Sequence, residues 1–319
     1  MTAKAHGLGL TAGWYANNCI CMEGKEPTQA MYAQDVHFLT DVFQFDAIKL
    51  DGCGKQLDLD VWARLINQSG RRVMIENCHW GFTVPNETWC PWNYFRSSGD
   101  VTPTYGSVVA NLLTTVQWAQ RGLSRPECWA YPDMLEVGCT AQGHSLTAVE
   151  TRTHFGAWCI VSSPLILSHD VDDDSVVDEI WPIISNKEAI AINQAWAGHS
   201  GSPFKQAAHT IALPGLSNVD GTWLWESASV PSWQYFYKPL GGGRAAVLMI
   251  NHDAKAQELT LDPHDIPGLV CSGGCTVRDV WAHQDLPAIQ GTLARSIASH
   301  DSAFLVLAPV GAESAAIVL

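Results

Sequence analysis

The chain has 319 residues, of which 47% are hydrophobic and only 16% are charged. This composition is typical of a globular protein with a sizeable core, and at roughly 150 residues per domain the length allows about two domains. Lysine and arginine total 18 against 32 aspartate and glutamate, a formal net charge of −14. So acidic a chain disfavours nucleic-acid binding, which requires basic patches. No apolar run approaches the ~18 residues of a membrane-spanning helix.

In the first part of the chain, short apolar runs alternate with longer helical patterns, which predicts a parallel α/β arrangement. The predicted strands are residues 8–15, 45–50, 72–77, 94–97 and 164–168. The predicted helices are residues 32–44, 57–69, 108–120, 147–161 and 186–194. The acidic run at residues 170–174 is interpreted as a solvated loop in preference to a calcium site.

Beyond about residue 198 the pattern changes to short strands separated by turn residues, which predicts an antiparallel β domain. The predicted strands are residues 223–226, 233–237, 245–251, 258–261, 276–280 and 303–307. The triplet Gly241–Gly243 has no phosphate-loop pattern and no following helix, so it is interpreted as a hairpin turn. We therefore expect an α/β barrel-like domain over residues 1–198 and an antiparallel β domain over residues 199–319.

The ten cysteines form no paired CxxC units, which disfavours a structural zinc site. Two acceptor motifs for N-glycosylation, Asn67-Gln-Ser69 and Asn86-Glu-Thr88, agree with an oxidising secretory route. The first fifteen residues lack the apolar core of a signal peptide.

Carboxylates follow several predicted strands, and reactive groups in parallel α/β folds gather at the carboxyl ends of strands. Lys49 and Asp51 stand two apart, so they project to the same side of one strand. Each carboxylate also has a simpler explanation, since Asp51-Gly52 is a common turn pair and Asp100 or Asp133 would suit a cap or a turn. Three carboxylates at separate strand ends nevertheless suit glycoside cleavage, in which one carboxylate attacks or activates water and another protonates the departing oxygen.

Seven strings, in one order along the chain, resemble the signature of glycoside hydrolase family 27, the α-galactosidase or melibiase family. They are IKLDGCG (48–54), ENCHWG (76–81), FRSSGD (95–100), PDML (132–135), SSPLILSHDV (162–171), NKEAIAINQ (186–194) and VRDVWAHQDL (277–286). The resemblance implies a (β/α)8 TIM barrel followed by a C-terminal antiparallel β-sandwich. Family members have two further strand–helix units before the segment that residues 6–15 resemble, so we expect a barrel truncated at its N-terminus, with about six of its eight strands.

The resemblance also implies a retaining glycoside hydrolase that releases terminal α-D-galactosyl residues through a covalent glycosyl-enzyme. Asp51 matches the nucleophile, and Asp100 matches the acid/base. Five further residues match substrate-binding positions: Tyr15, Lys49, His79, Arg96 and Asp133. No metal or organic cofactor is implied, because two carboxylates suffice for the reaction.

His79 departs from the family pattern. Galactose-cleaving members commonly have glutamate at this position, and members that cleave N-acetylgalactosamine have a small residue. An imidazole can hydrogen-bond a 2-hydroxyl but is bulky for an acetamide, which favours an unsubstituted hexose or pentose. The alternatives are activity on α-N-acetylgalactosamine or β-L-arabinopyranose, and an inactive, truncated sugar-binding protein.

The resemblance implies two disulfides in the first domain. One joins Cys78 to Cys90, and the other joins Cys53 to Cys21 or Cys19. The expected partner is a galactoside oligosaccharide or glycoconjugate, and the sequence leaves a homodimer open. The full-length protein is expected in the secretory pathway, with an extracellular, lysosomal or vacuolar destination.

Overall fold

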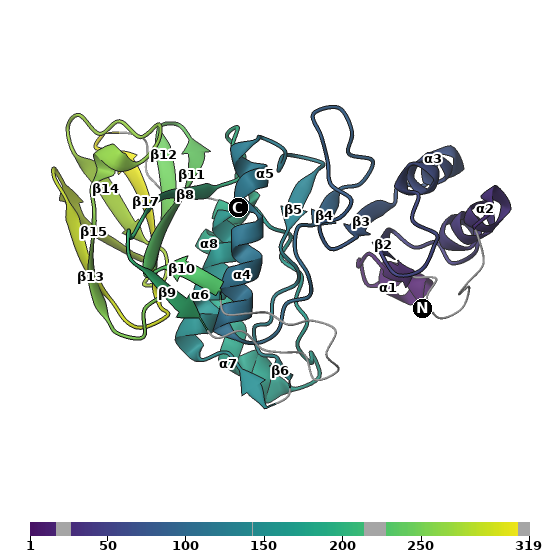
Figure 1. The fold of residues 1–319 in the computed structure, drawn as a ribbon, viewed down its shortest axis with the longest axis horizontal. Coiled ribbons are helices and arrows are strands. Elements are labelled where there is room, and N and C mark those ends of the chain that lie inside the picture. The colour runs from purple at the N-terminus through teal and green to yellow at the C-terminus, as the bar shows by residue number, and fades with distance from the viewer. Residues whose placement is uncertain (17–26, 142, 214–227, 312–319) are drawn as a thin grey trace. The chain divides into compact units, whose positions relative to one another are not determined.

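The computed structural model describes residues 1–16, 27–141, 143–213 and 228–311. The chain divides into two compact units: unit 1 comprises residues 1–99 and 126–131, and unit 2 comprises residues 100–125 and 132–319 (Figure 1). The break after Gly99 arises because the later helices share one apolar core with the C-terminal strands. The domain boundary at residue 198 stays a prediction.

Unit 1 contains a parallel sheet whose strands follow one another in chain order. The strands are β1 (Gly13–Ala16), β2 (Ala47–Asp51), β3 (Met74–Cys78), β4 (Tyr94–Arg96) and β5 (Trp129–Tyr131). Four of them fall within predicted strands or extend them by one residue, whereas the three-residue β5 was not predicted. The strand predicted over residues 164–168 is wrong, because that segment of unit 2 makes only an isolated parallel bridge between Leu135 and Leu167.

The helices of unit 1 are α1 (Thr2–Gly7), α2 (Gln29–His37), the π-helical turn η1 (Phe38–Val42) and α3 (Leu59–Ser69). The third helix shows how local sequence sets these bounds. Asp58 caps its start, since Oδ1 accepts the Val61 amide at 3.0 Å, and Gly70 ends it in the left-handed region at φ 76°. Its buried residues include Leu59 and Trp62, one helical turn apart on the face turned inward.

The described residues of unit 2 include the α-helices α4 (Tyr105–Thr114), α5 (Val116–Gln120), α6 (Ala148–Ile160), α7 (Asp174–Ile184) and α8 (Lys187–Gln194), and the short 3-10 helix η2 (Pro263–Asp265). The single helix predicted over residues 108–120 is therefore two. Residues 170–173 of the acidic run form an exposed turn before α7, which confirms the predicted loop, and Asp174 is the first residue of the helix. The Asp173 carboxylate accepts the amides of Ser175 and Val176 at 3.0 and 3.2 Å. This carboxylate is a helix cap.

Half of the described strands of unit 2 belong to an antiparallel six-stranded sheet in the order β15-β14-β17-β12-β11-β8. These are β8 (Ser202–Gln206), β11 (Trp233–Gly241), β12 (Arg244–Asn251), β14 (Cys275–Asp279), β15 (Gln284–Ile289) and β17 (Ser302–Pro309). Three two-stranded pairs accompany it: β6 (Thr140–Ala141) with β7 (His144–Ser145), β9 (Thr210–Leu213) with β10 (Ala228–Pro231), and β13 (Gln257–Leu261) with β16 (Leu293–Ile297).

The central strand β12 joins two apolar clusters of unit 2. Leu248 and Ile250 pack with α4, α6 and α8, while Val247 and Met249 face the cluster that includes β13 and β16. The glycines of Gly241–Gly243 all have positive φ and connect β11 to β12, which confirms the predicted hairpin turn. The strand predicted over residues 223–226 lies outside the described residues.

Candidate active site

The parallel sheet of unit 1 carries a row of polar side chains on one face. Its register places Tyr15 opposite Lys49, Lys49 opposite Glu76, and Glu76 opposite Tyr94. Because side chains alternate along a strand, Asp51 projects to the same face, two residues beyond Lys49 at the carboxyl end of β2. This is the end of the strand at which parallel α/β folds place their reactive groups.

The Asp51 carboxylate is held in place by two hydrogen bonds. The Tyr15 hydroxyl donates to Oδ2, and the Cys53 amide donates to Oδ1 at 3.1 Å. Gly52 is closely packed, because an added Cβ would lie 3.2 Å from the Cα of His79 and the neighbouring residues would have to shift to accommodate it. Gly52 is therefore packed closely against the segment just after β3, which an Asp-Gly turn exposed to solvent would not be.

Lys49 pairs with a residue that the sequence analysis missed. Its Nζ lies 3.7 Å from Oε1 of Glu76, and the Tyr94 hydroxyl donates to Oε2 of the same carboxylate at 3.1 Å. Glu76 is only 5% exposed. Burial, with the Glu76 charge beside it, raises the pKa of Tyr94. The charged Glu76, directly after the apolar residues 73–75 of a predicted strand, was the available signal for this pair.

Arg96 is buried on the same face, where its Nη1 donates to the Cys78 sulfur at 3.5 Å. Cys78 is a free thiol, and burial raises its pKa to about 12 against the opposing effects of Arg96 and Lys49. Its side chain thus lies among the charged groups of the candidate site and does not reach the surface loops.

The predicted disulfide between Cys78 and Cys90 is therefore wrong. Cys90 is bonded to Cys128 across a Cα–Cα distance of 6.2 Å. The physical reason is position: Cys78 ends β3 with its sulfur on the polar face, whereas Cys90 and Cys128 lie in the segments that lead into β4 and β5. Cys53 is disulfide-bonded, but its predicted partners Cys19 and Cys21 lie outside the described residues.

His79 directly follows β3 and is 4% exposed. Its Nδ1 lies 2.8 Å from the Thr83 hydroxyl, while Nε2 is buried with no hydrogen-bond partner among the residues that the structure describes. Burial lowers the pKa of His79, and the nearby Asp51 charge opposes that shift only in part. The imidazole is therefore neutral at neutral pH.

The other two predicted carboxylates, Asp100 and Asp133, belong to unit 2. Asp100 is exposed at the start of the loop before α4. Asp133 is 3% exposed and has a φ of 87°. Its Oδ2 accepts the Val101 amide at 2.9 Å, and its Oδ1 accepts the Met134 amide at 2.8 Å. The predicted role of Asp133 in holding a sugar hydroxyl stays a prediction.

Near Asp133, Glu136 adds a second carboxyl group that the sequence analysis did not single out. Burial raises the pKa of Glu136 to about 7, and the Asp133 charge adds to the rise. Cys139 follows three residues later, with its sulfur 3.1 Å from the Ser168 hydroxyl. Asp133 and Glu136 therefore lie close to each other, and Glu136 keeps its proton to a higher pH than an ordinary carboxyl group.

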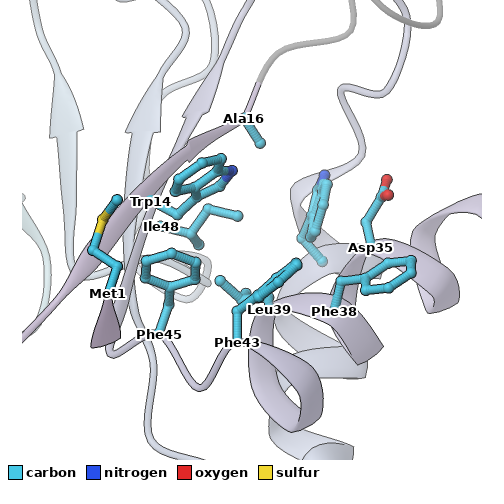
Figure 2. Close-up of a pocket in the computed structure, with 10 residues that line it drawn as sticks. Met1, Trp14, Ala16, Asp35, Phe38, Leu39, Phe43, Phe45 and Ile48 are labelled. Atoms are coloured by element: carbon cyan, nitrogen blue, oxygen red, sulfur yellow. The ribbon is translucent and has the colours of Figure 1, made fainter. Parts of the chain in front are cut away.

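A pocket of about 430 Å³ lies on the opposite face of the β1–β2 pair. Trp14 and Ile48 line it and, by alternation, point away from Tyr15 and Lys49. Figure 2 shows aromatic rings turned toward one another, and the centroids of Trp14 and Phe45 are 5.0 Å apart. With Asp35 as its charged lining residue, this apolar pocket is separate from the polar face described above.

The described ranges lack two features, a metal-binding cluster and a membrane-spanning helix. They contain no group of three or more His, Cys, Asp or Glu side chains arranged to hold a metal ion. None of the helices in those ranges combines the length and apolar character needed to cross a membrane.

Comparison with known proteins matches both parts of the chain. Residues 1–195 match the family described as alpha galactosidase A, and residues 231–307 match the alpha galactosidase C-terminal beta sandwich domain. The chain is 29% identical over 314 residues to an α-galactosidase of Oryza sativa subsp. japonica, covering 95% of this chain and 67% of that protein.

Solved structures share the fold. α-Galactosidase I from Mortierella vinacea superposes with a TM-score of 0.74 at 23% identity, covering 98% of this chain and 80% of that one. A family 27 β-L-arabinopyranosidase from Geobacillus stearothermophilus gives a TM-score of 0.74 at 16% identity, with coverages of 98% and 77%.

A parallel α/β barrel with polar groups at its strand ends, followed by an antiparallel β-sandwich, defines a glycosidase-like enzyme. The chain belongs to the α-galactosidase A (melibiase) family, because that family's model matches more than half of its residues. The family resemblance and the fold class expected from the sequence are thereby confirmed.

Proposed function

We propose that this protein is a retaining glycoside hydrolase that releases terminal α-galactosyl residues, with Asp51 as nucleophile and Asp100 as acid/base. The observation that carries the proposal is the placement of Asp51: its carboxylate stands at the carboxyl end of β2 and is oriented by the Tyr15 hydroxyl and the Cys53 amide. Family membership and the α-galactosidase names of the relatives support the substrate class.

The proposed reaction has two displacements. An Asp51 oxygen attacks the anomeric carbon while the bond to the departing oxygen breaks, and Asp100 gives that oxygen its proton. Asp100 then takes a proton from water, whose oxygen attacks the anomeric carbon and releases Asp51. Retention requires the two carboxyl groups to lie ~5–5.5 Å apart across the sugar.

Cationic and aromatic groups on the Asp51 face are proposed to hold the sugar. Lys49 and Arg96 supply N–H donors for hydroxyl groups of the sugar, and Tyr15 lines the proposed sugar site beside them. Lys49 Nζ lies 6.0 Å from the centre of the Tyr15 ring, so the two side chains form one wall. We propose that His79 shapes the wall at the 2-position, where its bulk disfavours an acetamide.

Rates on three aryl glycosides test the substrate class. We expect the highest kcat/KM on the aryl α-galactoside, and α-galactose as the first product seen by proton NMR. A β-configured first product would exclude retention. Faster release from the α-N-acetylgalactosaminide or the β-L-arabinopyranoside would favour those activities, and the second has a structural neighbour in the Geobacillus enzyme. Galactose binding without turnover would favour an inactive sugar-binding protein.

Replacing the nucleophile tests the role of Asp51. Asp51→Asn should lower kcat on the aryl α-galactoside by about 10⁴-fold, because no carboxylate remains to form the glycosyl-enzyme. The unfolding midpoint should change little, since the amide keeps the side-chain shape. Asp35→Asn makes the same chemical change at an exposed position of α2 and should leave the rate unaltered. Near-normal turnover by Asp51→Asn would remove this residue as nucleophile.

We further propose that the protein matures in an oxidising compartment. The described residues include two disulfides with both partners placed, Cys90–Cys128 and Cys271–Cys275. Such bonds persist in secretory and extracellular settings and are rare in the reducing cytosol.

A further inference from the structure

Asp133 combines three properties that rarely occur together. It is buried, it has a side chain at φ 87°, and both of its carboxylate oxygens accept backbone amides. Positive φ is uncommon outside glycine, although aspartate tolerates it better than most residues. A residue persists in this conformation only where its surroundings fix it, and such residues cluster at functional sites.

Two helices of unit 2 fix the backbone at this point. From α4, the Asn111 side chain donates to the Pro132 carbonyl at 3.0 Å. From α6, the Trp158 indole donates to the Asp133 carbonyl at 2.6 Å. Asn111 and Trp158 are both fully buried, so the position of the Asp133 carboxylate is determined by packed elements on two sides.

The loop that follows Asp100 is anchored just as firmly. The Val101 side chain belongs to the apolar core of unit 2, and its amide donates to Asp133 Oδ2 at 2.9 Å. The Thr102 amide donates to the Ser107 hydroxyl at 2.9 Å. Two consecutive residues are thus fixed, and the exposed Asp100 side chain stands immediately before them.

We propose that Asp133 is a positioning residue for the acid/base. Its buried carboxylate holds the Val101 amide and thereby sets where the adjoining Asp100 carboxyl group stands. This inference rests on the proposed function of Asp100. It differs from the sugar-holding role that the resemblance implies, because it assigns the buried carboxylate to holding the Val101 and Met134 amides.

The consequence for catalysis depends on the leaving group. A misplacement of about 1 Å at a reacting group can cost ~10²-fold in rate. Protonation of the departing oxygen matters most when the leaving group is poor and least when it is a good one. Loosening the Val101 anchor should therefore resemble a weakened general acid and should leave sugar binding largely intact.

The kinetic test compares Asp133→Asn, Asp133→Ala and Asp100→Ala on aryl α-galactosides whose phenols span good to poor leaving groups. For Asp133→Ala we expect a loss of about 10²-fold in kcat on the poorest leaving group, less than about 5-fold on the best, and KM within about 3-fold. Asp133→Asn keeps one oxygen acceptor and should fall between wild type and alanine. A rise in KM shared by all substrates, with kcat preserved, would mean a sugar-holding residue and would overturn the inference.

Asp100→Ala separates this inference from the proposed function. Equal losses on good and poor leaving groups for Asp100→Ala, or no turnover by the wild-type chain, would overturn the acid/base role and the positioning role with it. A steep leaving-group dependence for Asp100→Ala beside uniform losses for Asp133→Ala would overturn the positioning role alone.

Amide hydrogen exchange supplies a readout that does not depend on turnover. In the full chain, the Val101 amide should exchange at least about 10-fold faster in Asp133→Ala than in wild type, because it loses its acceptor, and Asp133→Asn should fall between the two because it keeps one oxygen acceptor. Glu136→Gln is the matched control, since it removes the neighbouring carboxyl group and leaves Asp133 in place; it should leave this exchange unchanged. Unaltered exchange in both Asp133 variants would overturn the inference.

Discussion

The two main sheets of the molecule differ in the kinds of side chain that they bury. The parallel sheet of unit 1 buries charged groups on one face, where Glu76 is 5% and Arg96 is 2% exposed. The antiparallel sheet of unit 2 buries apolar side chains on both faces of β12, where Val247 and Leu248 are inaccessible to solvent. Burying charge costs free energy unless each group is paired, whereas apolar burial is favourable throughout. The charged groups of the first sheet lie together on the face of the candidate site, whereas the apolar packing around β12 chiefly contributes to stability, although Lys238 in the neighbouring β11 is also buried.

The largest effect on stability is expected in the antiparallel sheet. Leu305 in β17 has no exposed surface and lies in the cluster that includes β13. Leu305→Ala should lower the free energy of unfolding by about 2–5 kcal/mol, because it leaves a cavity in a close-packed core. Urea unfolding followed by circular dichroism measures this loss. Val270→Ala, at a position 70% exposed, should cost less than about 0.5 kcal/mol. Equal costs at the two positions would contradict the stability role assigned to this sheet.

Removal of disulfides tests the corrected cysteine pairing in unit 1. Cys90 and Cys128 are 38 residues apart, so Cys90→Ser with Cys128→Ser should lower the free energy of unfolding by about 2–4 kcal/mol. Cys271→Ser with Cys275→Ser removes a bond that spans a separation of only 4 residues and should cost less. Peptide mapping without reduction should yield the 90–128 linkage. Recovery of a peptide joining Cys78 to Cys90 would restore the original prediction.

A smaller effect on stability, which depends on pH, is expected from the buried carboxyl group of Glu136 in unit 2. Burial, aided by Asp133, raises the pKa of Glu136 to about 7. The folded state therefore holds this proton more tightly than the unfolded chain, and stability falls as pH rises through the range from about 4.5 to 7. Glu136→Gln cannot ionise, so at pH 8 it should be more stable than wild type by roughly 1–3 kcal/mol. The gain should shrink toward pH 5 in thermal unfolding. A gain that is independent of pH would contradict this account.

Local signals allowed the sequence to predict much of the fold. In α3, the capping carboxylate of Asp58, the spaced apolar residues and Gly70 together specify a helix with its start and its end. The largely apolar strands β12 and β17 were likewise visible as short runs rich in branched residues. Asp51 was placed at a strand end, and the structure has it as the last residue of β2.

Features that depend on distant parts of the chain could not be predicted in the same way. β5 has only three residues and is a strand because β4 pairs with it. Glu76 is tolerated in a buried strand because Lys49 and Tyr94 meet it from neighbouring strands. The pairing of Cys90 depends on how close the segments before β4 and β5 lie to each other in the fold. The spacing of cysteines along the chain does not give this information.

The bond between Cys90 and Cys128 has a topological consequence. The chain leaves unit 1 after Gly99 and returns to it at Pro126, so this bond closes a loop that contains residues 100–125, the first of the two segments of unit 2. Asp100 is the first residue of that segment and therefore lies within the loop that the disulfide closes. A protease nick anywhere between the two half-cystines would leave both fragments tethered until a reductant is added.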